Sequence, residues 1–214
     1  MKIINPSVEI IDCPDGEELL KTIERCGRVC YKSEDRITED SAKRFIQQVL
    51  KSGHESVLEH GKITVKVICD RGVSHEIVRH RLASYSQEST RYCNYSNEKF
   101  GSELTFIIPN YWDDDGDHSK TLFGIWIQEM QHIEDAYNEM MQHGAKPEEA
   151  RSILPNSLKT ELVITMNLRE WRHFFKMRLS KRAHPQMREV AELIHKELKE
   201  RVPLIFDDIK TQET

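Results

Sequence analysis

A dense group of side chains that could bind phosphate lies between residues 79 and 91. This segment reads RHRLASYSQESTR and combines three arginines and a histidine with serine and threonine hydroxyls. Guanidinium groups match phosphate oxygens in bidentate fashion, and hydroxyl groups can complete such a binding shell. The segment predicts a site for a small polyanionic ligand. The alternative interpretation is a solvated basic helix end followed by a polar loop.

The glycines exclude the two common phosphate-binding loops. The chain has 9 glycines in 214 residues, and they are spread too widely for GxGxxG or GxxxxGK[ST]. A nucleotide would therefore be held by side chains and helix N-termini.

Charge is segregated along the chain although the net charge is only −5. Nine basic residues stand against two acidic ones from 151 to 188, whereas ten acidic residues stand against two basic ones from 111 to 150. A duplex-binding protein usually has a basic face that dominates the whole domain. We therefore expect a small polyanionic ligand and no nucleic-acid partner.

Two histidine pairs come close to a zinc motif but miss its spacing. His54 and His60 are six residues apart and His75 and His80 are five apart, whereas HExxH places both ligands on one helical face. No metal site is predicted, and a zinc hydrolase remains an alternative function.

The five cysteines are odd in number and lack a paired spacing, which favours a reducing compartment. The chain has neither an apolar run of the ~20 residues that a membrane span needs nor a signal-peptide pattern at its start. We expect a cytoplasmic protein that does not interact with a membrane.

Periodicity predicts the elements that must position these residues. Helices are expected at 15–31, 39–52, 71–81, 119–143 and 147–154, then from Asn167 and from Pro185 to before Pro203. Strands are expected at 62–70, 104–108 and 162–166, with a loop at 84–97 and an acidic turn at 113–117. Asp70 and Asn167 are the predicted N-caps of the helices that follow them. Because no linker or repeat interrupts the pattern, residues 1–214 are interpreted as a single α+β domain.

Together these segments resemble the flavin-dependent thymidylate synthases, the thymidylate synthase complementing proteins. The family signature RHRxxSxxxxSxR is matched at every fixed position by Arg79, His80, Arg81, Ser84, Ser89 and Arg91. The resemblance continues at 54–60, 151–155, 167–170 and 177–178, and it covers roughly residues 15–205.

The resemblance implies a twisted antiparallel sheet with flanking helices and a long helical segment. It also implies a homotetramer whose active sites are shared between subunits. The implied reaction converts dUMP to dTMP, with 5,10-methylenetetrahydrofolate as carbon donor, FAD as hydride carrier and NADPH as reductant. The expected partners are thus a second copy of the chain and small-molecule substrates.

The resemblance also assigns site residues by position. The implied FAD contacts are Ser56, Glu59, Arg79, His80, Arg81, Gln87, Asn167, Leu168, Arg169, His173 and Arg182. The implied dUMP contacts are Glu76, Arg79, Gln87, Glu88, Ser89, Thr90, Arg91, Arg151 and Arg178. His54 is expected beside the flavin ring, and Arg178 and His54 are the expected catalytic residues.

Within this reaction, Arg178 is interpreted as an electrostatic activator. Methylation at uracil C5 requires negative charge to develop on the pyrimidine, and a permanently protonated guanidinium can stabilise that charge. Ser89 and Arg91 are expected to hold the 5′-phosphate, and Cys93 is interpreted as structural. The alternative from another class is a nucleotide-binding regulatory module that uses the same loop without chemistry.

Overall fold

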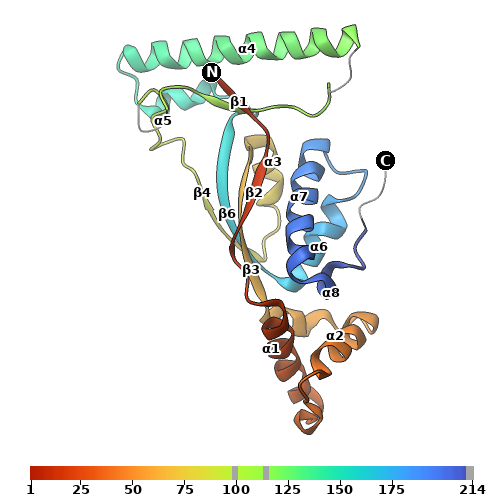
Figure 1. The fold of residues 1–214 in the computed structure, drawn as a ribbon. Coiled ribbons are helices and arrows are strands. Elements are labelled where there is room, and N and C mark those ends of the chain that lie inside the picture. The colour runs from red at the N-terminus through yellow and green to blue at the C-terminus, as the bar shows by residue number, and fades with distance from the viewer. Residues whose placement is uncertain (98–100, 113–115, 211–214) are drawn as a thin grey trace. The chain divides into compact units, whose positions relative to one another are not determined.

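The computed structural model describes residues 1–97, 101–112 and 116–210 (Figure 1). Its strands are β1 (Lys2–Ile4), β2 (Ser7–Asp12), β3 (Lys62–Asp70), β4 (Ala83–Gln87), β5 (Thr105–Ile107) and β6 (Lys159–Asn167). Its α-helices are α1 (Gly16–Arg28), α2 (Ser41–Lys51), α3 (Arg71–Ile77), α4 (Asp117–Gln142), α5 (Pro147–Ala150), α6 (Leu168–Arg178), α7 (Pro185–Arg201) and α8 (Pro203–Phe206). Short 3-10 helices are η1 (Val29–Tyr31), η2 (Glu34–Arg36), η3 (Glu55–His60) and η5 (Arg151–Ile153).

The chain divides into two compact units. The first consists of Met1–Ser7, Val67–Val78 and Ser86–Leu162, and the second of Val8–Lys66, Arg79–Tyr85 and Val163–Thr214. Each unit is assembled from segments that are distant in sequence. The single domain over residues 1–214 stays a prediction.

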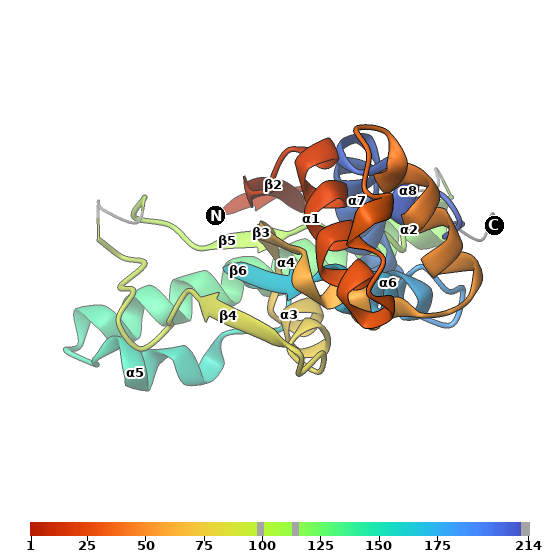
Figure 2. The ribbon, with the colours of Figure 1, turned by 90° about the horizontal axis from the view of Figure 1, so that it is seen from below.

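A four-stranded sheet has the order β2-β3-β6-β4. Its central strands β3 and β6 are antiparallel, since Leu168 N donates to Gly61 O near one end and Arg71 N donates to Leu158 O near the other. Figure 2 shows the neighbouring strands β4 and β6 pointing in opposite directions. The predicted α+β class with an antiparallel sheet is confirmed, and the separate pair β1 and β5 is parallel.

Side-chain alternation explains why β3 and β6 form strands. In β3 the alternating apolar side chains are fully buried, namely Ile63, Val65, Val67 and Cys69. In β6 the corresponding side chains are at most 1% exposed, namely Leu162, Ile164 and Met166. Successive side chains of a strand point to opposite faces, so this pattern buries one face of the sheet.

Each of these strands ends at a polar residue that begins a helix. The Asp70 carboxylate accepts a hydrogen bond from Val73 N at 2.8 Å and caps α3. The Asn167 side-chain oxygen accepts one from Glu170 N at 2.8 Å and caps α6. Both predicted caps are confirmed, and each satisfies a backbone N–H that has no partner within its helix.

In the first unit, α4 packs through one stripe of side chains. Met130 and Tyr137 are buried in a cluster with Leu104, Phe106 and Leu158. This stripe therefore packs α4 into the core of the first unit. No helix in the described ranges has both the length and the apolar character needed to cross a bilayer.

In the second unit, α6, α7 and α8 lie together (Figure 1), and Phe175 of α6 contacts His195 of α7 and Phe206 of α8. Trp171, Phe174 and Phe175 are fully buried, and Trp171 Nε1 donates to Ile63 O at 3.1 Å. This bond ties α6 to the start of β3. The aromatic cluster therefore holds α6 in place, and α6 carries several of the predicted site residues.

Two sequence expectations are wrong. The helix after Asp70 ends at Ile77 instead of continuing to about Arg81, because the chain turns before entering the sheet. Residues 84–87 belong to β4 instead of a loop, and their polar composition suits a strand at the end of the sheet order. The acidic residues 113–115 of the predicted turn lie outside the described residues.

A buried arginine joins α6 to the segment after α8. Arg172 is 2% exposed, and its guanidinium donates to both Asp208 carboxylate oxygens at 2.6 and 2.7 Å. It also donates to Ile205 O and, through Nε, to Glu55 Oε1 at 3.2 Å. This guanidinium thus connects three separate segments of the second unit.

Asp208→Asn should lower the free energy of unfolding by about 1–2 kcal/mol at neutral pH. A charged hydrogen bond contributes about that much, and we discount it because the Asp208 side chain is 55% exposed. The Arg172 guanidinium lowers the pKa of Asp208, so this contribution is present above the ordinary Asp pKa of about 4 and is lost as pH falls through the lowered value.

Urea unfolding from pH 7 to pH 2 measures this difference. The matched control is Asp207→Asn, because the Asp207 carboxylate forms an exposed ion pair with Lys199 Nζ at 3.5 Å. Equal stability of the two variants at pH 7 would contradict the role of the Arg172 network.

Candidate active site

The arginine-rich segment separates into exposed arginines and a buried histidine. Arg79 and Arg81 are exposed, whereas His80 is only 5% exposed. All three follow α3 in the turn that leads to β4. The two arginines therefore reach solvent, and the histidine between them faces protein.

The His80 imidazole is bound on both sides by residues of α6. Its Nδ1 lies 3.1 Å from Glu170 Oε1, and its Nε2 accepts a hydrogen bond from Arg178 Nε at 3.1 Å. Arginine has no acceptor atom, so Nε2 must carry the lone pair and Nδ1 must carry the proton. The geometry therefore defines a neutral His80 that donates to Glu170.

The electrostatics agree with a neutral imidazole. Burial lowers the pKa of His80, the hydrogen bond with Glu170 opposes that shift, and the Arg178 charge adds to it. The resulting pKa lies below the ordinary histidine value. His80 is therefore uncharged at neutral pH.

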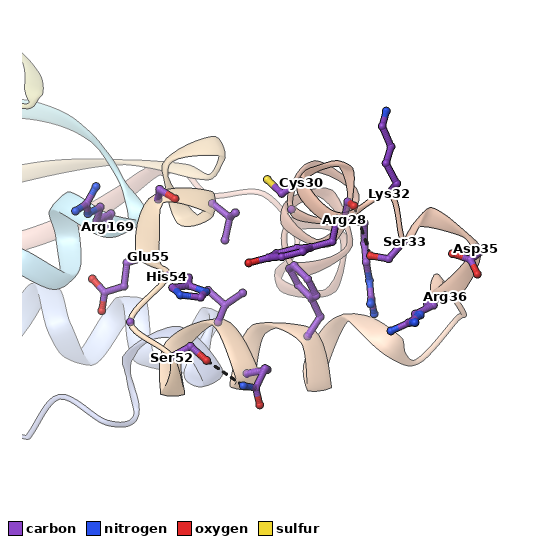
Figure 3. A pocket seen from close by; sticks show the side chains of 18 residues that line it. Arg28, Cys30, Lys32, Ser33, Asp35, Arg36, Ser52, His54, Glu55 and Arg169 are labelled. Carbon is purple, nitrogen blue, oxygen red and sulfur yellow. Dashed lines mark hydrogen bonds between the residues drawn. The ribbon is translucent and has the colours of Figure 1, made fainter.

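The predicted flavin residues His54, Ser56 and Arg169 line one pocket of the second unit. Its volume is about 940 Å³, within the range of sites for large organic ligands. Figure 3 shows Arg169 toward one end and Arg36 toward the other, with His54 between them. Basic side chains of α1, η2 and α6, together with Lys32 after η1, thus line a space large enough for a dinucleotide.

Other predicted flavin residues of the same unit differ in their exposure and in whether their polar groups already have hydrogen-bond partners. Arg169 donates to Glu59 Oε1 at 2.6 Å, and both side chains are half exposed. Leu168 is buried and its N–H is already bonded to Gly61, and the Asn167 side chain caps α6. His173 and Arg182 are exposed.

Two of the predicted dUMP residues are held in the first unit by hydrogen bonds. Gln87 Nε2 donates to Ser74 Oγ at 3.0 Å and to Thr160 Oγ1 at 3.2 Å. The Glu88 carboxylate accepts from Tyr95 Oη at 2.9 Å and from Lys159 Nζ at 3.0 Å. These bonds fix the chain where β4 ends.

The residues after Glu88 form a tight turn. Ser89 Oγ accepts from Arg91 N at 3.3 Å, and Thr90 is buried. Arg91 is exposed and lies 3.8 Å from Glu148. Arg151 is exposed in η5, and Glu76 is partly buried in α3. The first unit therefore holds Glu76, Gln87 to Arg91 and Arg151, whereas the second holds Arg79, Arg178 and most of the predicted flavin residues.

Several residues of these networks were missed by the sequence predictions. Glu170 stands out in the sequence only as part of the matching segment 167–170, although its carboxylate meets His80. Glu55 lies between His54 and Ser56 and is bonded to Arg172. In the sequence, Glu170 follows the predicted cap Asn167 by one helical turn. This position indicates that Glu170 lies early in the helix, but it does not indicate the distant partner of its side chain.

One group of potential metal ligands occurs among the described residues: His80, Glu170 and His173, whose ligand atoms lie within 4.8 Å of one another. However, both ring nitrogens of His80 already have hydrogen-bond partners, and one of these is the Arg178 guanidinium. A cation bound there would be repelled by that charge. The group is better explained as a hydrogen-bond network.

Comparison with known proteins identifies the family. The model of the thymidylate synthase complementing protein family matches residues 10–204. The chain belongs to this family. The match includes most residues of both units and all of the predicted site residues.

The relatives of this family member include proteins named flavin-dependent thymidylate synthase. The chain is 38% identical over 185 residues to one from Pyrococcus furiosus, covering 86% of this chain and 71% of that protein. It is 33% identical over 204 residues to one from Geobacter sulfurreducens, covering 91% and 82%.

A solved structure shares the fold. A UMP/dUMP methylase from Streptomyces cacaoi, bound with 5-Br dUMP, aligns with a TM-score of 0.80 and 22% sequence identity. The alignment covers 97% of this chain and 96% of that one. At 22% identity this likeness shows that the two chains share a fold.

Lys159→Met should lower the free energy of unfolding by about 2–3 kcal/mol at pH 7. Lys159 is 18% exposed and contacts both Glu88 and Glu161, so its loss leaves two partly buried carboxylates close together. Burial lowers the pKa of Lys159, but hydrogen bonds and charges of the two glutamates outweigh it and keep that pKa above its ordinary value.

Because the folded-state pKa is raised, the lysine contribution is complete at neutral pH and is lost only as pH rises through that value. Denaturant titration compares the variant with Lys159→Arg, which retains the charge. If Lys159→Met is as stable as Lys159→Arg at pH 7, the ion network does not stabilise this turn.

Proposed function

We propose that this chain is a flavin-dependent thymidylate synthase. In this proposal it methylates dUMP to dTMP with FAD, takes the carbon from 5,10-methylenetetrahydrofolate and the electrons from NADPH, and releases tetrahydrofolate. The observation that supports it most directly is the hydrogen bond between His80 of the signature and Arg178, which are 98 residues apart in sequence. The fold thus brings two separate family segments into contact.

The pocket that contains His54 fits a flavin dinucleotide. Its volume of about 940 Å³ and its basic lining suit a ligand that has both rings and phosphates. Ser56 and Arg169 would contact that ligand, and His54 would lie beside its ring. When bound, the flavin supplies hydride transfer, and the protein supplies binding and orientation.

The predicted substrate residues suit a mononucleotide. Arg178 would stabilise the negative charge that develops on the pyrimidine when C5 becomes nucleophilic. Arg91, Ser89 and backbone N–H groups of the turn would bind the 5′-phosphate. Gln87, held by Ser74 and Thr160, would present a fixed edge to the substrate. Glu76, Arg79 and Arg151 complete the proposed dUMP contacts.

We include assembly and location in the same proposal. The active form would be a homotetramer whose subunits share active sites, and the protein would be cytoplasmic. Light scattering of the flavin-loaded protein tests the assembly, and a monomer that retains full activity would contradict shared sites.

Purified protein should acquire a flavin absorbance spectrum when incubated with FAD and should oxidise NADPH in a dUMP-dependent manner. Anaerobic absorbance titration, first with NADPH and then with dUMP and methylenetetrahydrofolate, measures each step. A flavin spectrum that NADPH does not bleach would instead favour the regulatory-module interpretation. A protein that binds no flavin would refute the proposal.

Arg178→Ala should lower kcat by at least about 100-fold, since removal of one transition-state donor has an effect of that order. It should also weaken dUMP binding, measured by calorimetry. Arg188→Ala is the matched control, because Arg188 is also an arginine of the second unit but contacts Glu192 at 3.9 Å and lies outside the proposed site. Near-native activity of Arg178→Ala would disprove the activator role.

A further inference from the structure

We propose that Glu170 and His80 form a positioning pair that sets the orientation of the Arg178 guanidinium toward dUMP. This inference rests on the proposed role of Arg178 as the residue that activates the pyrimidine. Neither Glu170 nor His80 needs to touch the substrate for this role. Both act through one hydrogen bond, from Arg178 Nε to His80 Nε2.

The hydrogen-bond directions leave one arrangement of protons. Because Arg178 can only donate, His80 must accept at Nε2 and must therefore donate from Nδ1. The Glu170 carboxylate accepts the hydrogen bond from that N–H, with 3.1 Å between Nδ1 and Oε1. If Glu170 could not accept, the buried Nδ1–H would lose its acceptor, and a neutral imidazole could then keep the Arg178 contact only by leaving that N–H unpaired. Glu170 therefore determines whether His80 can hold Arg178.

The pair is itself held in place. Glu170 is 6% exposed, and its backbone N–H is bonded to the Asn167 cap. The His80 ring packs edge-on against Phe174 with 4.9 Å between ring centroids, and Tyr85 Oη donates to His80 O at 2.6 Å. The imidazole is thus fixed from α6, and the His80 backbone is held from β4. A guanidinium that is hydrogen-bonded to such a fixed ring rotates less freely about its side-chain bonds.

Burial argues that this network does more than stabilise the fold. A buried ionised carboxylate has a desolvation cost. Replacement of a whole buried polar network by apolar side chains is often neutral or stabilising, whereas removal of one partner alone is destabilising. A structural role alone predicts that an apolar side chain of similar length at position 170 keeps dUMP binding. A positioning role predicts that stability and dUMP binding respond differently.

The groups around His80 also predict a pH effect. Glu170, His173 and Arg178 of α6 are the charged or titratable side chains that act on it, and Tyr85 contacts its backbone. Protonation of His80 converts Nε2 into a donor and places a second positive charge beside Arg178. Affinity for dUMP should therefore fall on the acid side as His80 becomes charged.

The first test reads the tautomer directly. Protein with ¹⁵N-labelled histidine should show a neutral His80 with its proton on Nδ1, assigned by the signal that disappears in His80→Gln. Glu170→Met should move the proton to Nε2, whereas Glu170→Gln, which keeps an acceptor oxygen, should not. An Nε2–H tautomer or a charged ring in the wild type at neutral pH overturns the positioning pair.

The second test is a double-mutant cycle on the flavin-loaded protein. Glu170→Met should weaken dUMP binding by about 10- to 100-fold, as loss of an orienting partner does at other sites, and Glu170→Gln by less than about threefold. In the Arg178→Ala background, Glu170→Met should have no further effect on binding. Additive losses would mean that Glu170 does not act through Arg178.

His195→Gln is the matched control. His195 is also buried at 6% exposure, packs edge-on against Phe175 at 4.9 Å and has a pKa lowered by burial. Its substitution should lower the melting temperature while dUMP affinity and its acid limb stay unchanged. If Glu170→Met behaves like this control, the pair is only structural.

Failure of the proposed function has a different signature. In that case Arg178→Ala leaves dUMP binding unchanged, which contradicts the role of Arg178 and with it the positioning role. An unexpected His80 tautomer with a strong Arg178→Ala effect overturns the positioning pair alone.

Discussion

The antiparallel pairing of β3 and β6, with a polar cap at the end of each strand, is the constraint on which the rest of the structure depends. Burial of one face fixes the register, because a shift by one residue would expose every apolar side chain. The register then fixes where Asn167 stands, and Asn167 fixes the first turn of α6. As a result, the side chains of α6 make three kinds of contact. Trp171 and Phe175 enter the core, Arg172 meets Glu55 and Asp208, and Glu170 and Arg178 meet His80.

Features encoded within a few residues could be predicted from the sequence, and features that depend on distant partners could not. The strand over Lys62–Asp70 and the caps at its end and at Asn167 follow from alternation and from side-chain chemistry within three residues. The strand over Ala83–Gln87 could not be found this way, because its polar residues are ordered by pairing with β6. Likewise, nothing near Glu170 indicates a partner 90 residues earlier in the chain. The resemblance named site residues, but it did not indicate which of them are buried.

The structure also changes the meaning of the basic surplus between residues 151 and 188. Several of its cations are matched by acids from elsewhere: Lys159 by Glu88, Arg169 by Glu59, and Arg172 by Asp208. These contacts stabilise separate parts of the chain, so the surplus is not a continuous surface for one ligand. Because these cations already have acidic partners in the protein, the count of basic residues is only a partly correct reason to predict a polyanionic ligand. The narrower basis is the set of basic side chains that line the pocket with His54.

The signature itself illustrates how a motif can mix two kinds of residue. Adjacent positions in a turn point in different directions, so Arg79 and Arg81 reach solvent while His80 enters the second unit. An exposed guanidinium can bind a phosphate directly. A buried neutral imidazole can instead transmit the position of one side chain to another, because its two nitrogens accept and donate on opposite sides. The same three residues can therefore supply both the contacts with a ligand and the support that keeps Arg178 in place.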